Sequence, residues 1–414
     1  MNHPARASGP HRAGVRRFEL GVNYWPRRSA MYLWREPDLG EVREDMAHIA
    51  ALGFQVVRLF VLAEDFLPAP LTVAADKVAR LVEVVRLAGE AGLGTVPTLI
   101  VINMSGRLWW PHWVLNRGRP ADLFSDPTLL RSQALLAETC ARALTGGGAV
   151  RAFDLTNEID AAQLPPSREA ARHWADRLAG SVRSAAPGVP IQIGAHLPSL
   201  SAENNMRVDD LARIADEDVM HAYPLYCDAA RSPLDPELVP FSCALTAALA
   251  QSGRATLMQE FGLPTSPPGT KGRTIRDDFL GRSVSQYLAS EEEAAAYYEA
   301  VLERLLATGA AGAYAWCFGD YDPRLFDRPP LDTAVRERSF GLVRADGTDK
   351  PVAGVFNRLR QRLERGERPP ETPPALLDVT PDAYYATPAE HFRRLYRCWL
   401  EKRGAAGGRV GCAS

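Results

Sequence analysis

The stretch VRAFDLTNEID, residues 150–160, begins as an apolar β-strand and then ends on an amide and a carboxylate, Asn157 and Glu158. Strands of a parallel sheet are buried on both faces, and a buried carboxylate without partners is strongly unfavourable. These two polar residues therefore indicate a strand end that opens into a site. The interpretation depends on the rest of the chain and on a second carboxylate in the same setting.

Short apolar runs alternate with amphipathic helical segments from residue 18 to about residue 366, which is typical of repeated βα units around a parallel sheet. The predicted strands span residues 18–24, 55–62, 94–102, 150–157, 189–195, 217–223, 255–261 and 311–318. The predicted helices span residues 38–52, 76–91, 127–144, 166–186, 207–215, 235–251, 290–308 and 351–365. This inventory predicts an α/β fold of the (β/α)8 TIM barrel type.

Two helix starts support this division of the chain. Asp126 precedes Pro127, and Ser290 is followed three residues later by Glu293, which is N-cap and capping-box chemistry. The competing fold is a doubly wound open sheet. Its glycine-rich G-x-G-x-x-G turn does not follow the first predicted strand. The sequence therefore favours the barrel.

The catalytic barrel is expected to span residues 18–366. Residues 1–17 are basic, rich in Pro and Gly and lack the apolar region of a secretory signal, so we expect a disordered tail and a cytoplasmic protein. Residues 367–414 are expected to form a Pro-rich connector, an amphipathic helix and a flexible tail. The apolar face of this short helical extension comprises Phe392, Leu395, Tyr396, Trp399 and Leu400. That face needs the barrel or a second subunit as its partner, so the protein is a monomer or a homo-oligomer.

Composition limits the classes of partner. The chain has 414 residues, 46% of them hydrophobic, and a formal net charge of -2 without a long basic run. We therefore expect no nucleic-acid partner and no membrane partner, because both recognition modes leave a charge or hydropathy pattern. The six cysteines include no C-x-x-C pair and no Cys/His cluster, so free thiols, no metal and no cofactor are expected.

Long connections follow three of the predicted strands, at residues 103–126, 262–289 and 319–350. They leave the carboxyl ends of the strands, where TIM-barrel enzymes build their sites. Trp109 and Trp110 lie in the first connection, and Trp316 lies at the end of the last strand. Indole faces stack on the apolar faces of sugar rings, so these residues are candidate substrate contacts. The alternative is that they pack the loops against the barrel.

The second carboxylate is Glu260, which ends the predicted strand ATLMQEF, residues 255–261. Glu158 and Glu260 then lie at the mouth of one barrel and can face each other across its pocket. Such a pair performs glycoside hydrolysis, in which one group protonates the leaving oxygen and the other attacks the anomeric carbon. Retention requires the carboxyls to be about 5 to 5.5 Å apart and inversion about 6.5 to 9.5 Å, and the sequence leaves this distance open.

These residues resemble a known family. The segments TNE (156–158) and QEFG (259–262) are similar to those of the clan A glycoside hydrolases. The segments LGVNYWP (20–26) and VRLF (57–60) are most similar to glycoside hydrolase family 5, the cellulase and mannanase group. The resemblance covers about residues 18–360. It implies a retaining (β/α)8 enzyme with Glu158 as acid/base and Glu260 as nucleophile.

The same resemblance implies roles for further residues. Asn157 corresponds to the amide that contacts the sugar 2-hydroxyl, and Arg58 to the arginine that supports the nucleophile. His221 and Tyr223 match the pair on the sixth strand, and Trp316 matches the platform under the sugar on the non-reducing side of the cleaved bond. From the residues alone, Arg58 could instead form a buried ion pair, and His221 could be a core histidine.

Two positions depart from the family pattern. The family usually ends the third strand with a histidine and follows the fourth-strand Asn-Glu with proline, and these positions are Asn103 and Ile159 here. Asn103 can hydrogen-bond a hydroxyl group but cannot titrate. The departure therefore concerns the choice of sugar more than the reaction.

The predicted function is an exo-acting retaining β-glycosidase that cleaves β-linked oligosaccharides by double displacement, with a preference for β-mannosides. The alternatives within the enzyme class are endo-β-mannanase, endo-β-glucanase, β-glucosidase and β-galactosidase. A catalytically silent sugar-binding barrel is the alternative from another class. A metal-dependent hydrolase is disfavoured because no H-x-H strand motif is present.

Overall fold

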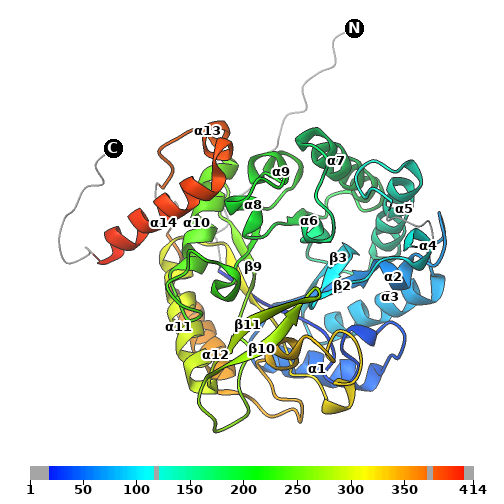
Figure 1. The fold of residues 1–414 in the computed structure, drawn as a ribbon. Coiled ribbons are helices and arrows are strands. Elements are labelled where there is room, and N and C mark those ends of the chain that lie inside the picture. Colours follow the sequence, from blue (N-terminus) through cyan, green and yellow to red (C-terminus); the bar gives the residue numbers. More distant parts are fainter. Residues whose placement is uncertain (1–17, 116–120, 371–375, 405–414) are drawn as a thin grey trace.

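The computed structural model describes residues 18–115, 121–370 and 376–404 (Figure 1). The tails expected over residues 1–17 and 405–414 lie outside these residues, as does the part of the Pro-rich connector at 371–375. The centre of the molecule is an eight-stranded sheet with the strand order β7-β6-β3-β2-β1-β12-β9-β8.

All eight predicted strands are confirmed. They are β1 (Glu19–Asn23), β2 (Val56–Leu62), β3 (Gly94–Val101), β6 (Phe153–Asn157), β7 (Ile191–Gly194), β8 (Val219–His221), β9 (Leu257–Phe261) and β12 (Gly312–Ala315). Neighbouring strands pair in parallel, and a parallel bridge between His196 and His221 joins the two edges of the sheet. The fold is therefore the predicted TIM barrel.

The predicted helices surround the sheet, with bounds shifted by three residues or fewer. They are α1 (Leu39–Ala51), α3 (Ala75–Glu90), α5 (Pro127–Leu144), α7 (Arg168–Ala185), α9 (Val208–Ile214), α10 (Leu238–Ala250), α11 (Glu291–Ala307) and α12 (Pro351–Glu364). Asp126 caps α5 by accepting hydrogen bonds from two backbone amides, and Ser290 and Glu293 form a complete capping box on α11. Within the described residues no helix is long and apolar enough to cross a membrane.

The barrel core follows from the sequence pattern. Every residue of β2 is buried, as expected of a strand covered on one face by side chains in the barrel and on the other by helices. Helix α7 buries Trp174, Leu178 and Val182 at spacings of four residues, which is one face of an α-helix. Burial of each such side chain stabilises the fold by roughly 1.5 to 3 kcal/mol.

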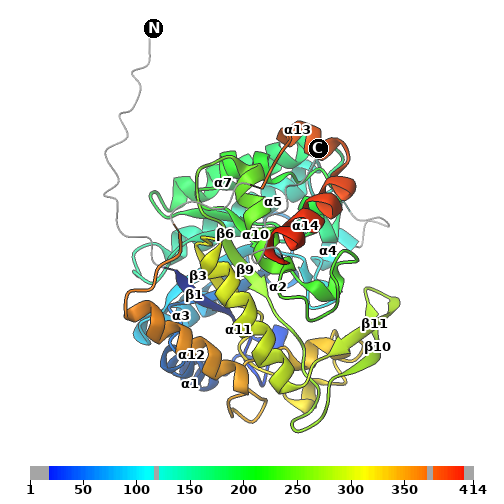
Figure 2. The same cartoon turned by 90° about the vertical axis from the view of Figure 1, so that its left-hand side faces the viewer.

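The C-terminal extension docks on the barrel. It consists of α13 (Pro381–Ala386) and α14 (Pro388–Gly404), and α14 lies along α10 in both views (Figures 1 and 2). The Phe241 ring of α10 lies 5.3 Å from the Phe392 ring and 4.9 Å from the Tyr396 ring. Trp399 Nε1 donates a 2.9 Å hydrogen bond to Glu237. The barrel itself therefore covers the apolar face for which a partner was expected.

The long connection at residues 262–289 contains a β-hairpin that the sequence did not predict. Strands β10 (Arg273–Phe279) and β11 (Arg282–Leu288) pair antiparallel through a turn whose residues, Leu280 and Gly281, both have positive φ. Such turns suit the twist of hairpins. The hairpin was missed because most of its residues are polar and few are buried, so it lacks the apolar run of a barrel strand. It projects from the mouth of the barrel (Figure 2).

The remaining connections form only short elements. These are α2 (Ala63–Phe66), α4 (His112–Leu115), α6 (Ile159–Ala162), α8 (Pro198–Ser201), the two-residue strands β4 (Asn103–Met104) and β5 (Arg107–Leu108), and the 3-10 helices η1 (Ala30–Tyr32), η2 (Pro224–Tyr226), η3 (Pro323–Leu325) and η4 (Val335–Ser339). Several of them border the carboxyl ends of the strands and shape the pocket described next.

Candidate active site

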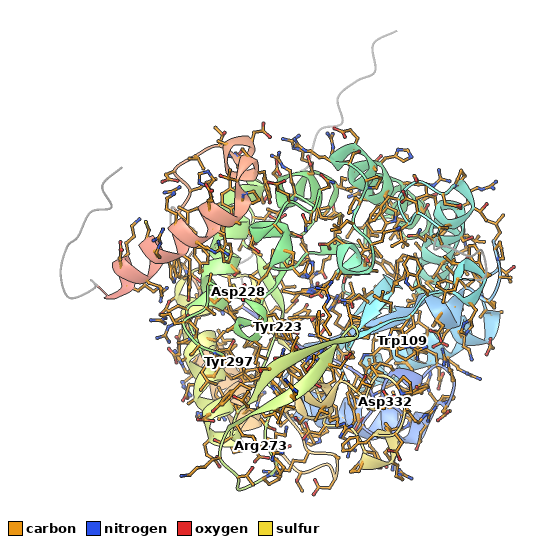
Figure 3. All side chains as sticks on the ribbon, viewed as in Figure 1. Trp109, Tyr223, Asp228, Arg273, Tyr297 and Asp332 are labelled. Atoms are coloured by element: carbon orange, nitrogen blue, oxygen red, sulfur yellow. The ribbon has the colours of Figure 1, made fainter. Side chains whose placement is uncertain are left out.

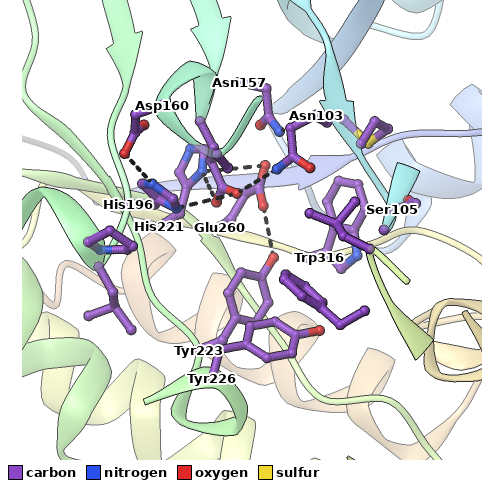
Figure 4. A pocket seen from close by; sticks show the side chains of 18 of the residues that line it. Asn103, Ser105, Asn157, Asp160, His196, His221, Tyr223, Tyr226, Glu260 and Trp316 are labelled. Carbon is purple, nitrogen blue, oxygen red and sulfur yellow. Dashed lines mark hydrogen bonds and ion pairs between the residues drawn. The ribbon is translucent and has the colours of Figure 1, made fainter. Parts of the chain in front are cut away.

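A pocket of about 520 Å³ opens at the carboxyl ends of the barrel strands. Most of the site residues predicted from sequence line it together, namely Asn103, Asn157, Glu158, His221, Tyr223, Glu260 and Trp316 (Figure 4). They come from five different strands or strand ends, and the register holds them at one level. His221 of β8, for example, pairs with Glu260 of β9. The barrel therefore assembles the site from segments that are far apart in the sequence.

Glu158 follows the last residue of β6 and adopts a left-handed conformation with φ of +46°. This conformation is uncommon for a residue with a side chain, and it turns the chain from β6 into α6. Oε1 of Glu158 lies 3.0 Å from Nδ1 of His221, and Oε2 accepts a 3.3 Å hydrogen bond from Asn103. The carboxyl group thus faces the pocket between an imidazole and an amide.

Glu260 is only 4% exposed and has different partners. Arg58 donates to Oε1 of Glu260, and the Tyr223 hydroxyl donates to Oε2 at 2.8 Å. The Arg58 guanidinium is fully buried and also bonds Asp154 at 2.8 Å and Asn157 Oδ1 at 3.0 Å. Arg58 therefore lies beneath the pocket, where it orients the Glu260 carboxylate and balances the charges of two acids.

The two carboxyl groups are close together. One oxygen of Glu158, one nitrogen of His221 and one oxygen of Glu260 all lie within 4.8 Å of one another. A spacing of about 5 to 5.5 Å between the carboxyls is that of retaining glycosidases, and inversion needs about 6.5 Å or more. These three residues could also be considered as metal ligands. The Arg58 guanidinium already binds Glu260, however, and a second cation beside it is electrostatically disfavoured.

His196 is a site residue that the sequence analysis missed. Its Nδ1 lies 3.5 Å from Oε2 of Glu158, and its Nε2 lies 2.8 Å from Asp160, which also accepts a hydrogen bond from Asn204. Burial acts to lower the pKa of His196, but the Asp160 and Glu158 carboxylates outweigh it and raise this pKa well above its usual value. The ring is therefore a cation beside Glu158.

The cation affects the carboxyl group. Burial acts to raise the pKa of Glu158, but the charge of His196 and hydrogen bonds to His196 and His221 lower it below its usual range. Glu158 therefore lies beside the proton that the His196 ring holds. The pKa of Tyr223 shifts in the opposite direction, because burial and the adjacent Glu260 charge raise the pKa of its phenol well above 10.0. The phenol thus remains a hydrogen-bond donor to Glu260.

A signal for His196 exists in the sequence, because it directly follows the fifth predicted strand, at the end where the site residues gather. For the other residues that line the pocket, the sequence contains no comparable signal of a place in the site. Tyr226, Phe279, Leu280, Arg336, Glu337 and Phe340 come from η2, from the hairpin and from the last long connection. Their approach to the pocket depends on loop paths that local sequence patterns do not specify.

The positions of Trp109 and Trp110 argue against the prediction that these two residues contact the substrate. Trp109 is fully buried and donates a 3.1 Å hydrogen bond from Nε1 to the backbone of Met104, and Trp110 is 6% exposed. Neither residue lines the pocket. Figure 3 shows Trp109 to one side of the barrel mouth and Tyr223 near its centre. The two indoles instead pack the loop against the barrel. Their burial removes a large apolar surface from water, which stabilises this arrangement.

Trp316 lies at the pocket. It follows β12, borders the pocket and is 5% exposed, with its ring 5.7 Å from that of Phe60 in an edge-on arrangement. The rim of the pocket carries apolar side chains on two sides. Phe279 and Leu280 at the hairpin tip are 38% and 37% exposed, and Leu164 is 60% exposed. The pocket thus has a polar floor and a partly apolar rim, which suits a sugar ring.

Comparisons with known proteins agree with this geometry. GH5_18 from Streptomyces cattleya, solved in complex with GlcNAc, superposes with a TM-score of 0.79 and 25% sequence identity over 95% of this chain and 92% of that protein. A Glu-to-Ala variant of GH5_18 from the same organism, in complex with Manβ1-4GlcNAc, gives a TM-score of 0.77 at 24% identity, with 94% and 92% of the two chains covered.

A third similar structure comes from a protein of which a smaller share is covered. The exo-β-1,4-mannosidase Op5Man5 from Opitutaceae bacterium strain TAV5 superposes with a TM-score of 0.70 and 27% identity over 86% of this chain and 61% of that one. No protein-family model and no curated protein matches the sequence. The family likeness therefore rests on the barrel, on the paired carboxylates and on these structures. The chain is most similar to the clan A glycoside hydrolases, and within them to glycoside hydrolase family 5.

Proposed function

We propose that Glu260 is the nucleophile and Glu158 the acid/base of a double-displacement β-glycosidase, within a catalytic barrel that spans residues 18–366. The observation that carries the proposal is the approach of the two carboxyls within 4.8 Å in different surroundings. Glu260 accepts hydrogen bonds from a guanidinium and a phenol, which hold both of its oxygens in place. Glu158 lies between His196 and His221, where it can gain and lose a proton.

The first step breaks the glycosidic bond. A Glu260 oxygen attacks the anomeric carbon while Glu158 donates a proton to the leaving oxygen, so a glycosyl ester forms and the alcohol departs. In the second step Glu158 takes a proton from water. The water oxygen then bonds the anomeric carbon and the ester bond breaks, which regenerates Glu260. Two inversions at one carbon give net retention.

Two further residues position the sugar in this scheme. Asn157 is held by Arg58 at its oxygen and donates from Nδ2 to the Asn103 carbonyl at 3.0 Å, which leaves one N–H for a sugar hydroxyl. Trp316 offers its indole to the sugar ring on the non-reducing side of the cleaved bond. These contacts would hold the anomeric carbon against Glu260.

We infer an exo-acting enzyme that prefers short β-mannosides. The similar proteins in complex with Manβ1-4GlcNAc and the similar exo-β-1,4-mannosidase support mannose as the sugar that is released. The β10–β11 hairpin supports the exo mode, because its tip residues Phe279 and Leu280 reach the pocket rim and shorten the space available to a polymer (Figure 1). A β-glucosidase and an endo-acting mannanase are the alternatives that the tests below distinguish.

Acid/base variants test the chemistry. Glu158→Gln and Glu260→Gln should each lower kcat by at least about 10²-fold on an unactivated substrate. Azide should rescue Glu158→Ala on an activated aryl glycoside and give a product of retained configuration. A rescue product of inverted configuration would assign Glu158 as the nucleophile. A wild-type protein that binds sugars but turns over no aryl β-glycoside would instead be a sugar-binding barrel.

A matched substrate series tests the specificity. Hydrolysis rates on the p-nitrophenyl β-mannoside, glucoside, galactoside and xyloside should be highest for the mannoside. Products from manno-oligosaccharides and soluble mannan should appear early as monosaccharide, with little loss of polymer viscosity. Rapid viscosity loss with mixed oligomers would show an endo-acting enzyme.

A further inference from the structure

A line of buried polar side chains crosses the barrel and ends at Glu158. Gln192 on β7 donates from Nε2 to Glu217 Oε2 at 2.6 Å, and Gln259 on β9 donates from Nε2 to Gln192 Oε1 at 2.7 Å. Gln259 Oε1 then lies 2.9 Å from His221 Nε2, and His221 Nδ1 lies 3.0 Å from Glu158 Oε1. The side chains of Gln192 and Gln259 are fully buried, so water does not replace these bonds.

The direction of these hydrogen bonds is set at the outer end. Glu217 pairs with Arg151 at 2.7 Å, and a carboxylate can only accept hydrogen bonds. The Gln192 amide must therefore point its NH₂ group at Glu217 and its oxygen at Gln259. The Gln259 amide is oriented in the same sense, with its oxygen toward His221. Because that oxygen only accepts, Nε2 of His221 carries a hydrogen.

The orientation has a consequence at the other ring nitrogen. With a hydrogen on Nε2, a neutral His221 can only accept at Nδ1, and a hydrogen bond then requires the proton on Glu158. If His221 is charged, the proton is on Nδ1 instead. In both states one proton lies between Nδ1 and Oε1. The reversed amide orientation would allow a neutral ring with hydrogen on Nδ1 only, which leaves Glu158 without a proton to donate.

We propose that Glu217, Gln192 and Gln259 form an amide relay that selects the Nε2–H form of His221 and thereby keeps one proton at the His221–Glu158 contact for the acid step. The inference rests on the proposed role of Glu158 as acid/base. Gln192 and Gln259 are positioning residues in this scheme, because they act through His221 and do not line the pocket. Both are neutral, so they set the tautomer without adding charge.

Other charged groups face the same contact. His196 lies 3.5 Å from Glu158 and pairs on its other side with Asp160. Glu260 lies 3.7 Å from Nδ1 of His221, and Arg58 and Tyr223 both bind Glu260. These groups influence how firmly the proton is held. None of them contacts Nε2 of His221 by hydrogen bond, and the choice between the two neutral tautomers is therefore left to Gln259.

The pH dependence of kcat/KM tests the relay. Gln259→Leu should move the basic limb to lower pH by about one unit on phenyl β-mannoside, which needs protonation of its leaving group, because one oriented hydrogen bond has about that effect. It should leave the rate on 2,4-dinitrophenyl β-mannoside nearly unchanged, since that leaving group departs without a proton. Gln192→Leu should act in the same direction, because it frees the Gln259 amide to reverse.

Gln133→Leu is the matched control. Gln133 is also a buried glutamine, 1% exposed, and it bonds Trp174 and the Leu123 backbone on the outside of the barrel. The control should lose comparable stability and keep the wild-type pH profile. If Gln259→Leu lowers the rates on both substrates equally without moving the basic limb, its role is only structural and the relay is wrong.

The tautomer can be measured without turnover. In the wild-type protein with ¹⁵N-labelled histidine, long-range ¹H–¹⁵N spectra, assigned with a His221→Gln variant, should show the Nε2–H form or the charged ring for His221. A neutral Nδ1–H ring would overturn the relay even if the glutamine variants fail to fold. A wild-type protein without activity on any aryl β-glycoside would refute the proposed function instead, and the spectra would still report on the relay.

Discussion

The Tyr223 hydroxyl donates a 2.8 Å hydrogen bond to Oε2 of Glu260, the carboxylate that Arg58 binds through Oε1. The phenol therefore contacts the oxygen that Arg58 leaves free. Glu260 is fixed at both oxygens by a guanidinium and a phenol, whereas Glu158 faces two imidazoles and an amide. This difference in partners is the physical basis for assigning different tasks to two chemically identical side chains.

Tyr223→Phe should lower kcat/KM by about 10- to 100-fold, because a hydrogen bond to a charged group contributes about 1.5 to 3 kcal/mol. The loss should appear in steady-state kinetics on an aryl β-mannoside. Tyr226→Phe is the control, since Tyr226 borders the same pocket but its hydroxyl accepts a 3.0 Å hydrogen bond from Arg336 and does not contact Glu260. Equal losses in both variants would argue against a special role for the Tyr223–Glu260 bond.

Trp316→Ala should lose both activity and stability. The indole lines the pocket but is 5% exposed, so its removal leaves a cavity and costs about 3 to 5 kcal/mol of unfolding free energy. Trp174→Ala, in the fully buried α7 position, should cost a similar free energy. Kinetics at a temperature where both variants are folded should show a large fall in kcat/KM for Trp316→Ala alone. Comparable kcat/KM values would remove Trp316 from the site.

Phe279→Ser should raise KM for a β-mannosyl disaccharide by about 10-fold while kcat changes little, because loss of one apolar contact weakens ground-state and transition-state binding alike. Phe279 is at the hairpin tip, and its ring lies 5.8 Å from that of Tyr226. Val284→Ser, on the same hairpin but outside the pocket, should leave KM unchanged. A KM that stays at the wild-type value in Phe279→Ser would place the second sugar elsewhere.

Ionisation of the buried Asp45 carboxyl should lower the free energy of unfolding as the pH rises. It accepts hydrogen bonds from Tyr24 and Arg27, and burial, opposed by Arg27 and aided by Glu41, raises the pKa of its carboxyl from 3.8 to about 7. The folded state then binds more protons than the unfolded state between these two values. The contribution of Asp45 to the free energy of unfolding therefore falls as the pH rises through about 7.

Urea unfolding at about pH 5 and about pH 8 measures this effect. The decrease in unfolding free energy between the two conditions should be smaller in Asp45→Asn, which cannot ionise, than in the wild type. Asp176→Asn on the surface of α7 is the control and should retain the wild-type difference. If Asp45→Asn keeps the full decrease, the group responsible is another one.

The barrel and the positions of the two carboxylates could be predicted from the sequence. Apolar runs and amphipathic segments are local patterns, and the eight strands appear within a few residues of their predicted bounds. Glu158 and Glu260 were recognisable because each interrupts an apolar strand at its carboxyl end, and parallel strands in a barrel bring all such ends together. The docking of α14 was foreseen only as one of two possibilities, because an apolar helix face does not specify its partner.

The side chains that surround the carboxylates could not be predicted from the sequence, because long-range packing brings them there. His196 reaches Glu158 through the path of the chain after β7, and the hairpin tip reaches the pocket although 121 residues separate Phe279 from Glu158. Trp109 looked like a sugar platform but is fully buried under its own loop. The approach of the two carboxyl groups, which have oxygens within 4.8 Å of each other and therefore favour retention, is likewise a property of the closed barrel. Local sequence patterns record the spacing along the chain, whereas these contacts depend on long-range packing.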